Sequence, residues 1–136
     1  ERHVFLGGFR ADAVELTKSF DIFALSSTSE GLSAALVHAM AASRVAVATS
    51  AGGTPEAVVD GETGFLVPPR DHAAMADRLV VLLKDDALRE RMGTAALARA
   101  RERFTLERMV GRTAAVYARL AGRPREAGTA SPSAAG

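Results

Sequence analysis

The sequence contains no cysteine, which excludes disulfide bonds, thiolate metal ligands and a cysteine nucleophile. It has no unbroken apolar run of the length that a membrane-spanning helix requires. It also lacks an excess of charge of either sign, because 17 Lys and Arg residues are nearly balanced by 16 Asp and Glu residues. A net charge of +1 gives no electrostatic reason to expect nucleic acid as a partner. The histidine and acidic residues do not show metal-ligand spacing, so no metal site is predicted.

The chain is long enough to form one domain with a hydrophobic core. Its 136 residues are 48% hydrophobic and 24% charged, a composition typical of a globular protein, and are too few for two domains. The first residues resemble no signal peptide and lead straight into an apolar run. We therefore expect the chain to be a piece of a longer protein.

Apolar runs typical of buried strands alternate with stretches of helical spacing. Strands are expected at Val4–Gly8, Asp21–Ser26, Val45–Thr49 and Gly64–Val67. Helices are expected at Asp12–Ser19, Leu32–Ser43, Pro55–Val59, from Asp71 onward, Asp86–Arg103 and Leu106–Leu120. The second of these is expected to turn Leu32, Leu36 and Met40 toward the core. The helix from Asp71 has apolar positions at Met75, Leu79, Leu82 and Leu83. This alternation predicts an α/β fold, a Rossmann-like parallel sheet flanked by helices. The arginines of the last helices are expected to form a solvated face: Arg89, Arg91, Arg99, Arg101 and Arg103.

Ligands of open parallel sheets bind outside the carboxyl ends of the strands. This rule selects three strand-to-helix turns rich in glycine or small hydroxyl residues: Gly7–Arg10, Ser26–Ser33 and Thr49–Thr54. A main chain without bulky side chains can approach a phosphate closely, and helix amino termini supply free N–H donors. Glycine also serves simply to make tight turns, so the pattern alone leaves ligand binding and turn formation equally open.

The segment from Ser26 to Thr63 carries a family resemblance. It reads SSTSEGLSAALVHAMAASRVAVATSAGGTPEAVVDGET and resembles the donor-site segment of retaining glycosyltransferases of family 4, glycosyltransferase group 1. The similarity extends over about Val4–Tyr117. It implies the C-terminal part of a GT-B nucleotide-sugar-binding domain over residues 1–121, and the small, polar, proline-bearing composition of residues 122–136 predicts a disordered tail. It also implies a cytoplasmic protein, peripheral to a membrane only through its parent enzyme.

The resemblance assigns a role to Glu30 and the residues after it. Glu30 matches the first glutamate of the family's Glu-x7-Glu motif, which implies a catalytic carboxylate at the transferred sugar of the donor. The alternative is a carboxylate that merely caps its helix. Gly31, Leu32 and Ser33 match the turn whose N–H groups face the donor's sugar and diphosphate. Glycine is usual in place of Ser33, whose hydroxyl either contacts a phosphate or satisfies the helix end.

His38 departs from the family pattern. It lies eight residues after Glu30, where the family has a second glutamate that binds both hydroxyls of the nucleotide ribose. Neutral imidazole accepts on one nitrogen and donates on the other, so we expect weaker or rearranged ribose binding. On the helical wheel His38 lies away from the core face, so it is not a core histidine. Either it still lines the pocket, or it faces solvent in a protein that no longer binds a nucleotide this way.

Two further turns are candidate binding residues by resemblance. Gly8 and Phe9 follow the strand that approaches the nucleobase, although Phe9 can equally pack on the sheet. Gly52 and Gly53 lie where the family binds the phosphates, although turn formation is the simpler role. Glu56 also matches a family position, but a helix-surface carboxylate is the simpler interpretation.

The resemblance implies transfer of a hexose-type sugar from a nucleoside diphosphate donor, with retention and without a bound metal or other cofactor. The family's diphosphate-binding arginine and lysine, and its amino-terminal acceptor domain, precede the segment matched here. We therefore expect this chain alone to be inactive, with an exposed sheet edge that favours self-association. Two alternatives remain: a degenerate, non-catalytic binding domain, indicated by Ser33 and His38, and a nucleotide-sugar epimerase on the same fold.

Overall fold

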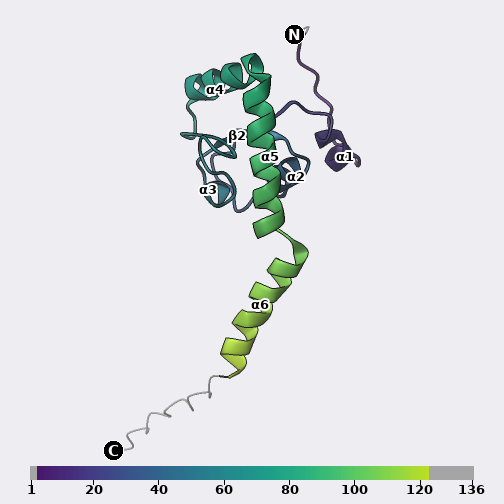
Figure 1. Cartoon of the computed structure of the whole chain (residues 1–136), viewed down its shortest axis with the longest axis vertical. Coiled ribbons are helices and arrows are strands. Elements are labelled where there is room, and N and C mark those ends of the chain that lie inside the picture. Colours follow the sequence, from purple (N-terminus) through teal and green to yellow (C-terminus); the bar gives the residue numbers. More distant parts are fainter. Residues whose placement is uncertain (1–2, 123–136) are drawn as a thin grey trace, which may run out of the picture. The chain divides into compact units, whose positions relative to one another are not determined.

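The computed structural model describes residues 3–122 and contains a three-stranded parallel sheet in the order β1-β2-β3 (Figure 1). The strands are β1 (Ile22–Leu25), β2 (Val45–Thr49) and β3 (Gly64–Val67). Residue Ile22 of β1 lies opposite Val45, and Ala46 lies opposite Gly64 of β3. Helices flank this sheet, so the predicted α/β fold is confirmed.

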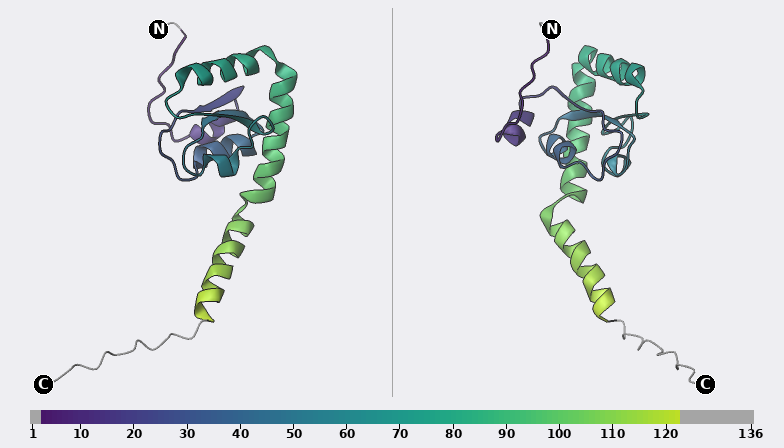
Figure 2. Two further views of the ribbon diagram at one scale, coloured as in Figure 1. Left: turned by 90° about the vertical axis from the view of Figure 1, so that its left-hand side faces the viewer. Right: turned by 180° about the vertical axis from the view of Figure 1, so that it is seen from behind.

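Six helices accompany the strands in the described part of the chain. They are α1 (Ala13–Thr17), α2 (Ala34–Ala41), α3 (Thr54–Ala57), α4 (His72–Lys84), α5 (Asp86–Arg103) and α6 (Leu106–Ala121). Figure 2 shows the sheet between α4 on one side and α2 on the other, with α5 running past both. Asp71 and Asp85 begin α4 and α5, since each carboxylate accepts a hydrogen bond from a main-chain N–H of the first turn.

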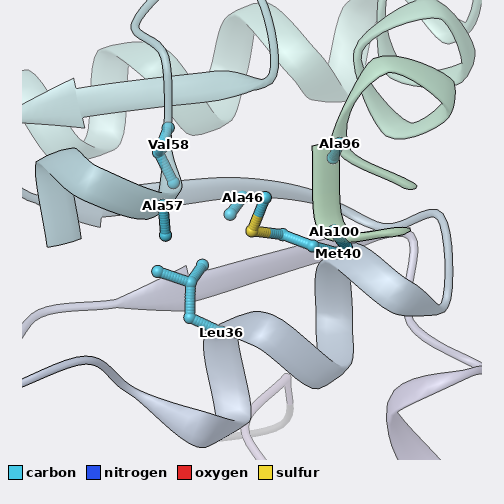
Figure 3. Packing of buried hydrophobic residues seen from close by; sticks show 7 residues of the cluster. All are labelled: Leu36, Met40, Ala46, Ala57, Val58, Ala96 and Ala100. Atoms are coloured by element: carbon cyan, nitrogen blue, oxygen red, sulfur yellow. The ribbon is translucent and has the colours of Figure 1, made fainter. Parts of the chain in front are cut away.

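The hydrophobic core lies on both faces of β2, every residue of which is buried, as the sequence predicted. On one face Leu36 and Met40 of α2 point toward Ala46, with α3 and the end of α5 closing the cluster (Figure 3). On the other face Val45 and Val47 pack with side chains of β3, α4 and α5. Helix α5 therefore contributes to both clusters.

Helix α5 comes unusually close to the chain between α2 and β2. A Cβ added at Gly93 would lie 2.3 Å from the main-chain oxygen of Ser43, a distance that real Cβ atoms do not reach. Two of its arginines are half-buried and bonded to main-chain oxygens, whereas a solvated face was predicted. Arg89 donates to the carbonyl of Leu82, and Arg99 donates to the carbonyls of Glu56 and Ala57, which lie at the end of α3. Their guanidinium groups satisfy helix-end oxygens that would otherwise be unpaired.

Three other predictions about burial were wrong. Residues 4–8 form no strand and are exposed, because an apolar run becomes a strand only when another strand supplies its hydrogen bonds. Leu32 precedes α2, which begins at Ala34, and its side chain is 45% exposed rather than part of the core. Leu83 points away from the core, and Leu82 alone of that pair is buried.

The described part of the chain divides into two units, one that ends at Thr105 and one that begins at Leu106. Taken by itself, α6 exposes its apolar side chains: Leu106, Met109, Val110, Val116, Tyr117 and Leu120. Apart from Gly122, the tail predicted at 122–136 lies outside the described residues. No helix within residues 3–122 combines the length and the apolar character that crossing a bilayer requires.

Candidate functional site

Two strand-to-helix turns meet at the carboxyl edge of the sheet. Strands β1 and β2 are parallel neighbours with Leu25 opposite Ala48, so the turns that follow them leave the sheet at the same edge. The N–H of Gly53 in the second turn lies 2.9 Å from the carbonyl oxygen of Gly31 and 3.3 Å from that of Glu30 in the first. We refer to residues 27–33 and 49–53 together as the junction.

Glycine is required on the second side of the junction by close packing of main chains. Gly52 has a φ of +52°, and a Cβ there would lie 1.6 Å from the carbonyl oxygen of Glu30. A Cβ at Gly53 would lie 2.6 Å from the carbonyl oxygen of Gly31. Neither position has room for a side chain, so the close approach of the two turns requires glycine at both.

Glu30 is held by its own turn rather than by α2. Its Oε2 accepts a hydrogen bond of 3.0 Å from the Ser27 hydroxyl, and its side chain is half-buried. The Thr49 hydroxyl donates to the main-chain oxygen of Ser27, which ties the end of β2 to the same turn. The first turn of α2 contains no acidic residue, so the helix-capping alternative for Glu30 does not describe the structure.

Ser33 provides the helix cap. Its Oγ accepts from the N–H of Leu36 at 3.4 Å, and the residue is buried. Of the two roles left open for this hydroxyl, the structure supports satisfaction of the helix end. Gly31 behaves differently from its neighbours, because a Cβ at this position would meet no atom within 4 Å. The main chain at Gly31 is therefore open on the side where a side chain would project, while its carbonyl oxygen packs against Gly53.

His38 is exposed on α2, which confirms that it is not a core histidine. Within residues 3–122 its side chain forms no hydrogen bond or ion pair with the junction. It lies five residues beyond Ser33, a rise of about 7.5 Å along the helix. The structure thus leaves the imidazole accessible.

The turn after the first apolar run is separate from the junction. Phe9 is 99% exposed, so the alternative in which it packs on the sheet does not describe the structure, and a Cβ at Gly8 would meet nothing within 4 Å. Arg10 forms two hydrogen bonds with the carboxylate of Asp12, at 2.8 and 2.6 Å. This pairing lowers the pKa of the Asp12 carboxyl and raises the pKa of Arg10.

Sequence analysis did not single out Ser27 or Thr49, and it misassigned Arg99. Ser27 and Glu30 form an S-x-x-E pattern, a local signal of a side-chain pair three residues apart. Thr49 and Arg99 form hydrogen bonds with residues 22 and 42 positions away in the sequence, and no local pattern reveals such contacts. Glu56 contributes its main-chain oxygen to Arg99 and exposes its side chain, as the simpler interpretation predicted.

A hollow is present at the opposite edge of the sheet, where the strands begin. It is lined by Asp21, Ser43, Arg44, Asp86, Arg89 and Glu90. Arg89 already pairs with Asp86 at 2.7 Å and with a main-chain oxygen. Among the residues from 3 to 122, no three His, Asp or Glu side chains are grouped to hold a metal ion.

Comparison with known proteins supplies the family. The profile of the family described as "Glycosyl transferases group 1" matches residues 1–85. The chain is 33% identical over 117 residues to the N-acetyl-alpha-D-glucosaminyl L-malate synthase of Bacillus anthracis, covering 86% of this chain and 30% of that protein.

Solved structures show the same fold. The Anabaena protein HepE, in complex with UDP and glucose, has a TM-score of 0.82 and 30% identity, covering 88% of this chain and 33% of that one. The C-terminal domain of a glycosyl transferase group 1 family protein, LpcC from Francisella tularensis, has a TM-score of 0.66 and 32% identity, covering 73% of this chain and 52% of that domain. The fold is that of GT-B glycosyltransferases, and the chain spans about a third or less of the full-length relatives.

Proposed function

Because the chain belongs to the glycosyl transferases group 1 family, we propose that it forms the donor-binding part of a retaining glycosyltransferase. Its substrate is a nucleoside diphosphate sugar of the hexose type, and the reaction transfers that sugar to an acceptor bound elsewhere in the parent enzyme. The observation that carries the proposal is the junction, where Glu30 and the open main chain at Gly31 meet the glycine turn after β2.

The chemistry of the junction suits such a donor. A carboxylate accepts hydrogen bonds from sugar hydroxyls, and these bonds are stronger than neutral ones. The main-chain N–H groups of Gly31 to Ser33 and the amino terminus of α2 offer partial positive charge to a diphosphate. Charge on the leaving diphosphate is thus stabilised electrostatically, without a metal ion in the proposed mechanism.

The relatives indicate which ligands to test first. HepE is described in complexes with UDP and with UDP-glucose, which makes uridine nucleotides the first probes for this chain. Acceptor groups and further diphosphate ligands belong to the remainder of the parent protein in this proposal, since relatives are about three times longer. Catalytic turnover is accordingly proposed only for the parent.

A second candidate is a degenerate binding domain that performs no transfer. It is favoured by one observation at each end of α2: the Ser33 hydroxyl is already engaged as a helix cap, and His38 replaces the expected second glutamate. Membership of a glycosyltransferase family favours transfer over an epimerase.

Calorimetric titration with UDP, GDP, ADP and their glucose conjugates tests the proposal. We expect saturable binding of one base, and a Glu30→Ala variant that weakens the sugar conjugate more than the bare nucleotide. Glu62→Ala is the matched control, because Glu62 is an exposed glutamate in the turn before β3. Equal weakening of both ligands in Glu30→Ala would exclude a sugar-binding role for Glu30, and binding without any sugar preference would favour the degenerate domain.

A further inference from the structure

Glu30 is constrained at its main chain and at its carboxylate by different residues. Gly52 brings its Cα against the carbonyl oxygen of Glu30 so closely that a Cβ would lie 1.6 Å from that oxygen. The N–H of Gly53 donates to the same carbonyl and to that of Gly31. The main chain of Glu30 is therefore fixed against the turn that follows β2.

The carboxylate is oriented by a second set of contacts. Ser27 donates its hydroxyl proton to Oε2 of Glu30 at 3.0 Å. Ser27 is itself held from β2, since the Thr49 hydroxyl donates to its main-chain oxygen. Thr49 is buried at the end of a strand whose residues all lie in the core. The orientation of the carboxylate therefore depends, through Ser27 and Thr49, on β2, the strand whose residues are all buried.

We propose that Gly52 and Ser27 are positioning residues that fix the Glu30 carboxylate before the donor binds. The inference rests on the proposed function, in which Glu30 accepts hydrogen bonds from the donor's sugar. A group that is already oriented loses little conformational freedom on binding, so its hydrogen bonds contribute more to affinity and to transition-state stabilisation. Every contact in this arrangement lies between residues 27 and 53, so it requires no other part of the parent.

The main-chain constraint can be tested without any ligand, by comparing Gly52→Ala with Gly61→Ala. Both glycines have positive φ, +52° and +76°, so both variants carry the same kind of backbone strain. A Cβ at Gly61 meets nothing within 4 Å, whereas one at Gly52 collides with Glu30. We expect Gly52→Ala to accelerate hydrogen exchange of the Gly53 amide about tenfold or more, and Gly61→Ala to leave it within about twofold. Equal exchange rates in the two variants would overturn this half of the proposal.

The carboxylate constraint is tested with Ser27→Ala, using UDP and UDP-glucose as probes. We expect the dissociation constant of UDP-glucose to rise about three- to tenfold, with that of UDP unchanged, because one hydrogen bond orienting the carboxylate is lost. Ser27→Thr keeps a hydroxyl and is expected to retain the preference for UDP-glucose over UDP. Ser29→Ala, which changes an exposed serine of the same turn, is the control.

The outcomes separate the two proposals. If Glu30→Ala lowers the preference for UDP-glucose over UDP and Ser27→Ala does not, the positioning role is wrong while the donor-binding role stands. If Glu30→Ala leaves that preference unchanged, the proposed function of Glu30 fails. In that event the hydrogen-exchange comparison still decides whether Gly52 fixes the Glu30 main chain.

Discussion

Two apolar runs of this molecule, Val45–Thr49 and Val4–Phe9, differ completely in burial. β2, Val45–Thr49, is buried at every residue, whereas Val4–Phe9 is exposed along its whole length. β2 has a parallel neighbour on each side and helices on both faces. The first run has no strand partner within residues 3–122. Apolar character alone therefore does not make a strand, because the main-chain hydrogen bonds must also be supplied.

The largest effect on stability is expected at Leu82, a buried residue whose neighbour Leu83 is exposed. Leu82→Ala removes a fully buried side chain from the cluster of β2, β3, α4 and α5, and we expect it to lower the free energy of unfolding by about 2–5 kcal/mol. Leu83→Ala, at a neighbour that is 64% exposed, is expected to change it by only about 0.5 kcal/mol. Urea denaturation followed by circular dichroism measures both. Similar losses of unfolding free energy in the two variants would show that the buried face of α4 is assigned incorrectly.

The same contrast extends to the first apolar run. Leu6→Ala is expected to change the free energy of unfolding by no more than about 0.5 kcal/mol, because Leu6 is exposed. The denaturation experiment used for Leu82 serves here. A loss approaching that of Leu82→Ala would mean that the run is buried in solution, which would contradict the comparison.

An effect between those of Leu82→Ala and Leu6→Ala is expected for Arg99→Ala. The guanidinium group donates to the carbonyl oxygens of Ala57 and Glu56, at 2.6 and 2.8 Å, and so fixes the end of α3 to α5. Loss of these bonds is expected to cost about 1–3 kcal/mol of unfolding free energy. Arg101→Ala, at an exposed arginine of the same helix, is the control. Melting temperatures that are unchanged in both variants would contradict a stabilising role for Arg99 and would support the solvated face predicted from the sequence.

Ser33→Ala tests the cap of α2. Because the hydroxyl accepts from the N–H of Leu36, we expect a loss of about 1 kcal/mol in unfolding free energy. Nucleotide affinity, measured on the same variant, should stay constant when the hydroxyl serves only the helix. A clear loss of affinity for UDP at unchanged stability would instead indicate a phosphate contact.

For His38→Glu the expected effect is on nucleotide affinity rather than on stability. A carboxylate accepts from both ribose hydroxyls and forms charge-assisted bonds, so the dissociation constant for UDP is expected to fall about fivefold. His72→Glu, at the exposed start of α4, is the control. Unchanged or weaker affinity, measured by calorimetry, would mean that position 38 does not face the ribose.

The comparison also shows what the sequence could predict. β2 and the long helices follow from apolar side chains repeated at strand or helical spacing, and the helix starts at Asp71 and near Asp86 agree within a residue or two. The Ser27–Glu30 pair is local and readable as S-x-x-E. Leu32 was misplaced because helical spacing continues past the true start of α2, which Ser33 sets by capping.

The contacts that complete the junction could not be predicted. Thr49 of β2 donates to the main-chain oxygen of Ser27, a residue 22 positions earlier in the turn after β1. The collision that excludes a side chain at Gly52 also depends on where two turns meet in space. Such contacts follow from parallel strand register, which brings the turns to one edge, and not from any pattern within a single element.

The most direct test of the central claim is to locate donor binding by two-dimensional ¹H–¹⁵N NMR. UDP-glucose is added to the labelled chain and the shifts of main-chain amides are followed. The account predicts saturable shifts concentrated at Gly31, Ser33 and Gly53, with none at Asp86 and Glu90 in the hollow at the opposite edge of the sheet. Shifts concentrated at that hollow, or no saturable shifts at millimolar ligand, would contradict a donor site at the junction.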